Sequence, residues 1–277
     1  MRYLAPAKLN LFLHILGRRA DGYHDLETVF QLVDLCDELT INTRPDGRIV
    51  RHPPPDDPML AALPDEDDLT IRAARLLQQA GATKQGANIH VRKQIPAGGG
   101  MGGGSSDAAT VLLALNRQWS LNLPLSRLAE LGLVLGSDVP VFVYGRTAFA
   151  SGRGEVLEPI ETPSRWFLVV KPPVMVATRE IFRARQLTRD TAPLRIRALP
   201  ADGGRNDCEK VVRIHHPEVA MVLDQLAPQG ARLTGTGACV FVPLESRAAA
   251  EVISTTLPRN WDVWIVRGLS QTPHFPL

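Results

Sequence analysis

Apolar residues recur along the first half of the chain in two spacings, one typical of strands and one typical of helices. In residues 69–80, Leu69, Ala73 and Leu76 have the helical spacing. The acidic run 65–68 directly before them favours a helix start because it complements the helix dipole, although such a run is also compatible with a metal site. The pattern predicts strands at 7–15, 26–33, 39–43, 88–95, 139–144 and 147–150, and helices at 69–80, 107–116 and 125–135.

A second series of elements follows a proline-rich crossover at residues 159–163. Because strands and helices are mixed in both halves, the sequence predicts an α+β protein of two domains, residues 1–158 and a smaller α/β unit at 159–277. An Asp-Gly turn at residues 18–22 predicts a hairpin, and residues 44–58 are expected to form a loop. The later elements are expected to be strands at 165–171, 240–243 and 262–267, and helices at 180–186, 207–214, 217–226 and 247–256.

Composition narrows the classes of partner. The 277 residues carry 31 basic and 29 acidic side chains, a formal net charge of +2, so electrostatics gives no reason to expect nucleic acid or an anionic membrane. No apolar stretch reaches the roughly 18 residues that a membrane-spanning helix needs. Cys36, Cys208 and Cys239 are widely separated, which excludes a Cys-x-x-Cys zinc site and predicts reduced, buried thiols in a cytoplasmic protein.

A glycine-rich loop lies between the strand predicted at 88–95 and the helix predicted at 107–116. Six glycines in seven positions remove the side chains that would keep a backbone away from a ligand. A loop in this place directs backbone N–H groups and the helix dipole at an anion, and phosphate is the natural occupant. A flexible linker is the alternative. The residues of the loop are Pro96, Ala97, Gly98, Gly99, Gly100, Met101, Gly102, Gly103, Gly104, Ser105 and Ser106.

The common phosphate-binding motifs do not describe this loop. A Walker A motif requires a lysine after the glycines, and none follows here. Gly98, Gly100 and Gly103 satisfy the dinucleotide pattern, but no acidic residue stands about 20 positions later to bind a ribose. The His-Arg-Asp and Asp-Phe-Gly motifs of protein kinases are absent from the sequence. With these three motifs excluded, the sequence predicts an ATP-binding loop of a different kind.

Three short clusters could contribute chemistry. Lys8 and Asn10 interrupt an apolar strand, where a lysine is more often simply solvent-facing. Asp138 stands between a predicted helix end and an apolar segment, a position also typical of a turn former or a cap. A second glycine turn, residues 235–237, precedes an apolar strand, and a tight turn with positive φ would explain it equally well.

Taken together, these segments resemble the GHMP kinases over nearly the whole chain. The similarity includes Pro6–Leu11, the Pro96–Asp107 loop, Ser137–Pro140, and Asn206-Asp207 with Gly235–Ala238. The segment Asp21-Gly22-Tyr23-His24 is the most specific, and it is similar to the branch of the family whose substrate is methylerythritol linked to cytidine diphosphate. The resemblance implies transfer of the ATP γ-phosphoryl group to the 2-hydroxyl of the methylerythritol unit, a step of non-mevalonate isoprenoid synthesis.

The resemblance also implies roles for individual residues. Asp138 would accept the hydroxyl proton, and Lys8 would keep Asp138 ionised and stabilise developing charge. The loop from Pro96 to Ser106 would bind the phosphates of ATP. Mg²⁺ is implied as a cofactor, but no pair of carboxylates is spaced to hold it, and no metal ligand is assigned.

At the substrate end, the resemblance implies that Tyr23 stacks on the cytosine ring and that His24 hydrogen-bonds the edge of the base. Phe182 would cover the other face of the ring, while Asn10 and Thr178 would contact the substrate. Three other functions remain open: a GHMP kinase for homoserine or mevalonate, a nucleotide-binding sensor without turnover, and a dinucleotide oxidoreductase. The chain could be a monomer or a homodimer.

Overall fold

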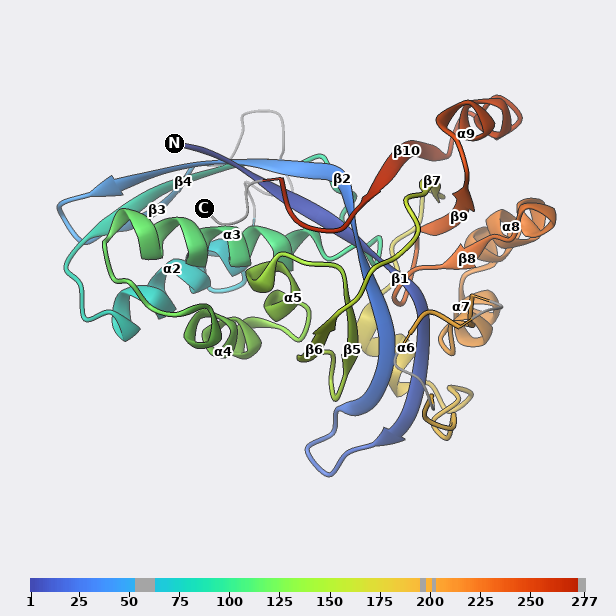
Figure 1. The fold of residues 1–277 in the computed structure, drawn as a ribbon, viewed down its shortest axis with the longest axis horizontal. Helices are drawn as coiled ribbons and strands as arrows, with labels where there is room; N and C mark the ends of the chain where they lie inside the picture. Colours follow the sequence, from blue (N-terminus) through green and yellow to red (C-terminus); the bar gives the residue numbers. More distant parts are fainter. Residues whose placement is uncertain (53–62, 195–197, 201–202, 274–277) are drawn as a thin grey trace.

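The computed structural model describes residues 1–52, 63–194, 198–200 and 203–273. Its strands form one ten-stranded sheet in which β3, β4, β2, β10, β7, β9 and β8 are neighbours in that order. The long strand β1 (Arg2–Arg18) lies off this path and pairs antiparallel with the long strand β2 (His24–Arg44). They run through most of the molecule in Figure 1, so the same two strands serve both halves of the fold.

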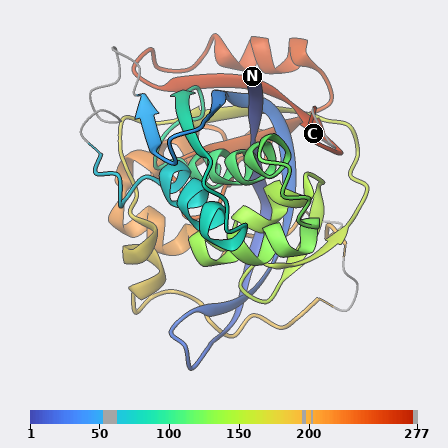
Figure 2. The same ribbon diagram turned by 90° about the vertical axis from the view of Figure 1, so that its left-hand side faces the viewer.

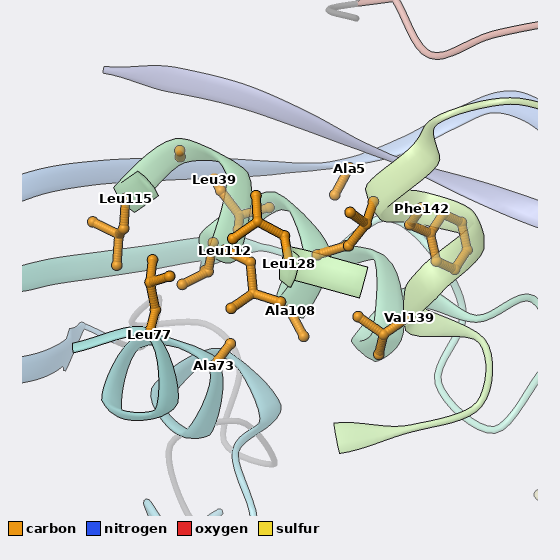
Figure 3. Close-up of a cluster of buried hydrophobic side chains, with 14 of the residues drawn as sticks. Ala5, Leu39, Ala73, Leu77, Ala108, Leu112, Leu115, Leu128, Val139 and Phe142 are labelled. Atoms are coloured by element: carbon orange, nitrogen blue, oxygen red, sulfur yellow. The ribbon is translucent and has the colours of Figure 1, made fainter. Parts of the chain in front are cut away.

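The first half places helices on one face of these strands. Strands β3 (Ile49–His52) and β4 (Gly86–Arg92) extend the sheet, while α2 (Leu69–Ala80), α3 (Gly103–Gln118), α4 (Leu125–Leu135) and α5 (Val139–Tyr144) cover it (Figures 1 and 2). Figure 3 shows the core between them, where Leu112 and Leu115 of α3 lie close to Leu77 and Leu128. Strands β5 (Ala148–Ser151) and β6 (Val156–Pro159) complete this half.

The second half contains the strands β7 (Trp166–Lys171), β8 (Arg232–Leu233), β9 (Val240–Leu244) and β10 (Asp262–Leu269). Its helices are α6 (Thr178–Arg183), α7 (Glu209–His215), α8 (Pro217–Gln225) and α9 (Arg247–Ser254), with a short 3₁₀ turn at Ala227–Gln229. A second apolar core lies among them. The last strand, β10, pairs with both β7 and β2 and therefore joins the two halves.

A third cluster of buried side chains belongs to both halves. It includes Leu9 and Val29 of the long hairpin, Met101 of the glycine loop, and Val169 and Phe241 of the second half. The glycine loop is therefore attached to an apolar layer that the two predicted domains share. The two-domain α+β architecture agrees with the sequence prediction.

Most predicted elements are found within a few residues of their expected bounds, and the helix at 125–135 agrees at both ends. The strand predicted at 139–144 is wrong, because these residues form helix α5. A short continuous apolar run does not separate a buried strand from a buried helix. Here Pro140 suits the first turn of a helix, and Gly145 ends it with φ of 63°.

Other differences are smaller. Strands predicted at 26–33 and 39–43 are parts of the single strand β2, in which Asp34 and Leu35 form a bulge without register partners in β1. Strands β3 and β6 are not predicted from the sequence, and residues 53–58 of the predicted loop lie outside the described residues. Asp68 caps helix α2 by accepting from the Thr70 amide at 2.7 Å and pairs with Arg51 at 3.2 Å, so the acidic run starts a helix as predicted.

Candidate active site

A pocket of about 500 Å³ lies between the two halves of the fold. Strand β1, the glycine loop and the start of α5 form one part of its wall, and α6 with the second glycine turn forms the other. Most of the residues singled out from the sequence as catalytic, phosphate-binding or substrate-binding line it, among them Lys8, Asn10, Pro96, Ala97, Gly98, Gly99, Gly100, Met101, Asp138, Thr178, Phe182 and Ser105. Gly102, Gly103 and Gly104 line the pocket as well.

Lys8 and Asp138 form an ion pair in the wall of the pocket. Lys8 is buried on β1, and its Nζ lies 3.1 Å from Oδ2 of Asp138. The same Nζ donates to Oδ1 of Asn10 at 2.5 Å and to the carbonyl of Gly100 at 3.1 Å. Asp138 precedes α5, but its side chain makes no capping hydrogen bond there. The cap interpretation of Asp138 therefore fails, and its carboxylate faces a lysine in the pocket.

The glycine loop passes from β4 to α3 with three residues in the left-handed region. Gly98, Gly100 and Gly102 have φ of 62°, 73° and 74°, a conformation that residues with a side chain adopt at a cost. Helix α3 then begins without a side-chain cap. Its first N–H groups have no acceptor within the helix, as at every helix start, and they lie where the loop lines the pocket.

The loop is held from its carbonyl side by the rest of the chain. Gly98 and Gly99 accept hydrogen bonds from the amides of Ala238 and Cys239 at 3.0 and 3.2 Å, and Met101 accepts from the Lys8 amide at 3.0 Å. These hydrogen bonds attach the loop both to the strand that contains Lys8 and to the second glycine turn, which argues against a flexible linker. The second glycine turn is part of the same assembly, because Gly235 and Thr236 line the pocket.

A buried charged cluster fixes the end of β4 where the loop begins. Asp37 accepts from the amides of Gln94 and Ile95 at 2.5 and 2.8 Å and also pairs with Lys93. Lys93 lies 2.7 Å from Asp107 of helix α3. Burial, followed by the charge of nearby Asp37, raises the pKa of Asp107 to about 7 despite the opposing effect of Lys93.

This pKa makes stability depend on pH in a specific direction. Between about pH 4 and 7 the folded protein retains a proton on Asp107 that the unfolded chain releases. The contribution of this group to the free energy of unfolding therefore decreases as the pH rises through that range. Asp107→Asn stays neutral, so the variant should gain stability relative to the wild type between pH 5 and pH 8. Urea unfolding at both pH values measures this difference.

Asp37→Asn is the contrasting variant, because the Asp37 carboxylate accepts two backbone amides and an ammonium group. We expect Asp37→Asn to be less stable than the wild type at both pH values. A stability difference for Asp107→Asn that did not change with pH would contradict the raised pKa.

The aromatic residues assigned to the substrate end are only partly gathered at the pocket. Phe182 lines it, whereas Tyr23 and His24 are not among its lining residues. Tyr23 is 51% exposed in the hairpin turn, and the guanidinium of Arg153 lies 3.9 Å from the centroid of its ring. His24 is buried, with its ring 5.2 Å from that of Phe182. One face of the Tyr23 ring is therefore covered by Arg153.

Asn10 and Thr178 are held by hydroxyl groups across the site. The backbone N–H of Asn10 donates to Thr234 Oγ1, and its side-chain Nδ2 donates to Thr28 Oγ1, both at 2.9 Å. Thr178 begins α6, and its hydroxyl lies 3.0 Å from that of Thr236. The structure brings both residues to the pocket wall.

Sequence reasoning missed Lys93 and Thr236 as pocket residues and treated Gly235 only as a turn. The sequence does hold a signal for each. Lys93 directly precedes the glycine loop, and Thr236 lies inside the second glycine-rich segment. Ser106 does not line the pocket: it is buried, and its hydroxyl has no hydrogen-bond partner among the described residues.

Comparison with known proteins agrees with this geometry. Residues 68–146 match the GHMP kinases N terminal domain, and residues 193–263 match the GHMP kinases C terminal domain. A 4-diphosphocytidyl-2-C-methyl-D-erythritol kinase of Alkalilimnicola ehrlichii is 55% identical over 269 residues, which cover 96% of this chain and 90% of that protein. One of Nitrosococcus oceani is 51% identical over 265 residues, covering 95% and 93%.

Solved structures give the same result. A crystal structure of 4-(cytidine 5'-diphospho)-2C-methyl-D-erythritol kinase matches with a TM-score of 0.79 and 32% identity, covering 97% of this chain and 99% of that one. The mevalonate kinase of Methanococcus jannaschii matches with a TM-score of 0.69 at 16% identity, covering 97% and 98%, and so shares the fold.

The chain belongs to the GHMP kinase family, the class that its two-domain fold and its glycine-lined pocket define. Within that family it groups with the 4-diphosphocytidyl-2-C-methyl-D-erythritol kinases, to which it is about half identical over nearly its whole length. The matched ranges leave the domain boundary between residues 146 and 193; its placement at residues 158/159 stays a prediction. No helix in the described part of the chain has the length and apolar character that crossing a membrane requires.

Proposed function

We propose that the chain catalyses the ATP-dependent phosphorylation of the 2-hydroxyl group of 4-diphosphocytidyl-2-C-methyl-D-erythritol. This reaction is a step of the non-mevalonate route to isoprenoid precursors. The observation that carries the proposal is the Lys8–Asp138 pair, 3.1 Å apart, in a pocket walled by the glycine loop. Relatives named as 4-diphosphocytidyl-2-C-methyl-D-erythritol kinases match 95–97% of the chain, which supports the proposal.

The proposed reaction transfers one phosphoryl group and one proton. The oxygen of the substrate's 2-hydroxyl group attacks the γ-phosphorus while Asp138 accepts the hydroxyl proton. The bond between the γ-phosphorus and the β–γ bridging oxygen breaks, and ADP is released. Lys8 lies close enough to Asp138 to hold its carboxylate in place and to stabilise negative charge on the transferred group. The open amides at the start of α3 bind the phosphates of ATP.

ATP is expected to bind with Mg²⁺, which neutralises phosphate charge during transfer. Mg²⁺ takes oxygen ligands, and in sites of this kind most come from phosphates and water with one or two carboxylates. In this pocket Ser105 supplies a hydroxyl, and the phosphates of ATP with water would supply the other oxygen ligands. Ser106 does not line the pocket, and Asp138 is assigned to the proton, so we propose Ser105 as the residue of this chain that would help to hold the ion.

The test is phosphoryl transfer by the purified protein with three candidate acceptors. We expect ADP formation with diphosphocytidyl-methylerythritol and none above background with homoserine or mevalonate. Phosphorus NMR of the product should show one new phosphomonoester and an intact diphosphate. Turnover of homoserine or mevalonate in preference to the cytidine substrate would contradict the proposal. ATP binding without turnover of any acceptor would support the sensor function instead.

Stacking at the base end gives a separate prediction. Phe182 lines the pocket and Tyr23 is 51% exposed, and one base–aromatic stack contributes about 1–3 kcal/mol. Phe182→Ala and Tyr23→Ala should each raise the KM for the cytidine substrate about tenfold or more, while the KM for ATP changes little. Steady-state kinetics with each substrate varied in turn measures this. If both variants keep the wild-type KM, the assignment of the cytidine end is wrong.

We also propose that the enzyme works in the cytoplasm as a monomer or homodimer. The three cysteines are free and buried, and burial raises the pKa of each thiol to about 12, as suits thiols that stay reduced. Light scattering of the purified protein distinguishes the two assembly states.

A further inference from the structure

Arg189, which does not line the pocket, binds two of the residues assigned to the base end. Its Nε donates to Nε2 of His24 at 3.0 Å. Its Nη2 donates to the carbonyls of Phe182 and Ala184 at 2.9 and 2.8 Å, and its Nη1 donates to the carbonyl of Leu187 at 3.1 Å. One guanidinium therefore ties the start of β2 to the end of α6.

The bond to His24 determines where the imidazole proton lies. A guanidinium only donates hydrogen bonds and stays protonated at any pH that a folded protein tolerates. Nε2 of His24 must therefore offer its lone pair to Arg189, and a neutral ring then carries its proton on Nδ1. Burial, together with the charges of Arg189 and Arg18, lowers the pKa of His24 and so favours the neutral ring.

The remaining polar group of the ring is then a donor. No described residue hydrogen-bonds Nδ1 of His24, and the ring packs against Phe182 with an interplanar angle of 31°. An N–H group calls for an acceptor. On its pairing edge cytosine presents the acceptors O2 and N3, whereas N3 of uracil carries a hydrogen and repels a second donor.

We propose that Arg189 is a positioning residue for the nucleotide-base end of the substrate: it fixes His24 as the Nδ1-protonated tautomer and anchors Phe182 through its carbonyl. The preference for cytidine over uridine then depends on a residue outside the pocket. This inference rests on the proposed function only in its choice of base, because the tautomer is a property of the free protein.

The first experiment measures the tautomer without substrate. In protein labelled with ¹⁵N-histidine, at a pH well above the His24 pKa, long-range proton–nitrogen spectra distinguish a protonated from an unprotonated ring nitrogen. His24→Asn assigns the signals. We expect Nδ1 protonated and Nε2 unprotonated in the wild type, and a mixture of tautomers in Arg189→Met. Arg185→Met, an exposed arginine in the same segment, is the matched control and should match the wild type.

The second experiment measures specificity with the cytidine and uridine forms of the substrate. A hydrogen bond to a charged donor is strong enough that Arg189→Met should raise the KM for the cytidine form about tenfold or more. The ratio of kcat/KM between the two forms should fall, while the KM for ATP stays within about twofold. Arg189→Lys retains the charge but cannot make all four hydrogen bonds, so its KM and its specificity ratio should lie between those of the wild type and Arg189→Met. It also provides the test if Arg189→Met does not fold.

Each result decides the proposal. A wild-type His24 protonated on Nε2, or a tautomer unchanged in the Arg189 variants, overturns it. A changed tautomer with an unchanged cytidine-to-uridine ratio overturns the specificity role. If the wild type does not phosphorylate the cytidine substrate at all, the proposed function fails, and the NMR result still decides whether Arg189 fixes His24.

Discussion

Asp138→Asn is expected to lower kcat by about 10²–10⁴-fold, the usual loss when a general base is removed. Asparagine has nearly the same size, but its amide cannot accept the hydroxyl proton. Lys8 would keep its contacts with Asn10 and the Gly100 carbonyl, so the pocket should retain its shape. The KM values for ATP and for the cytidine substrate should therefore change far less than kcat.

Single-turnover kinetics with saturating ATP measures this effect without the influence of product release. Asp67→Asn is the matched control, since Asp67 is exposed and lies outside the pocket; it should retain wild-type turnover. Near-normal turnover in Asp138→Asn would mean that the carboxylate only pairs with Lys8 and that another group takes the proton.

Gly100→Ala is expected to reduce kcat/KM for ATP at least about tenfold. Gly100 has φ of +73°, and a Cβ there would lie 2.3 Å from the Thr234 carbonyl oxygen. The left-handed conformation alone costs a residue with a side chain roughly 1–2 kcal/mol, and the blocking atom belongs to backbone and cannot rotate away. The loop must therefore move off the second glycine turn, and the Gly100 carbonyl moves away from Lys8.

Gly17→Ala is the matched control outside the pocket. A Cβ at Gly17 would meet no atom within 4 Å, and its φ is not positive. We expect this variant to bind ATP like the wild type. Calorimetric titration with an ATP analogue compares the two proteins, and circular dichroism checks that both fold. Equal affinities would show that the phosphates do not contact the loop near Gly100.

Local chemistry explains what could be predicted correctly from the sequence. The helix at 125–135 has apolar spacing and a glycine directly after it, and Asp68 starts α2 through its own side chain. The glycine loop is recognisable because consecutive glycines lose much conformational entropy on folding. They are typical of places where the backbone must approach a ligand closely. The strand prediction for residues 139–144 was wrong because their continuous apolar run fits a buried strand and a buried helix equally well.

The sequence by itself determined the class of protein, because the motifs that identify the family are contiguous. The tertiary structure decided which distant groups meet. Lys8 and Asp138 are 130 positions apart and touch only because β1 and the start of α5 face one pocket; the sequence placed them together by resemblance alone. Arg189 and His24 are separated by 165 positions. No periodicity encodes such pairs, because the first contact depends on how β1 packs against α5 and the second on how β2 packs against the segment after α6. The whole core determines both arrangements.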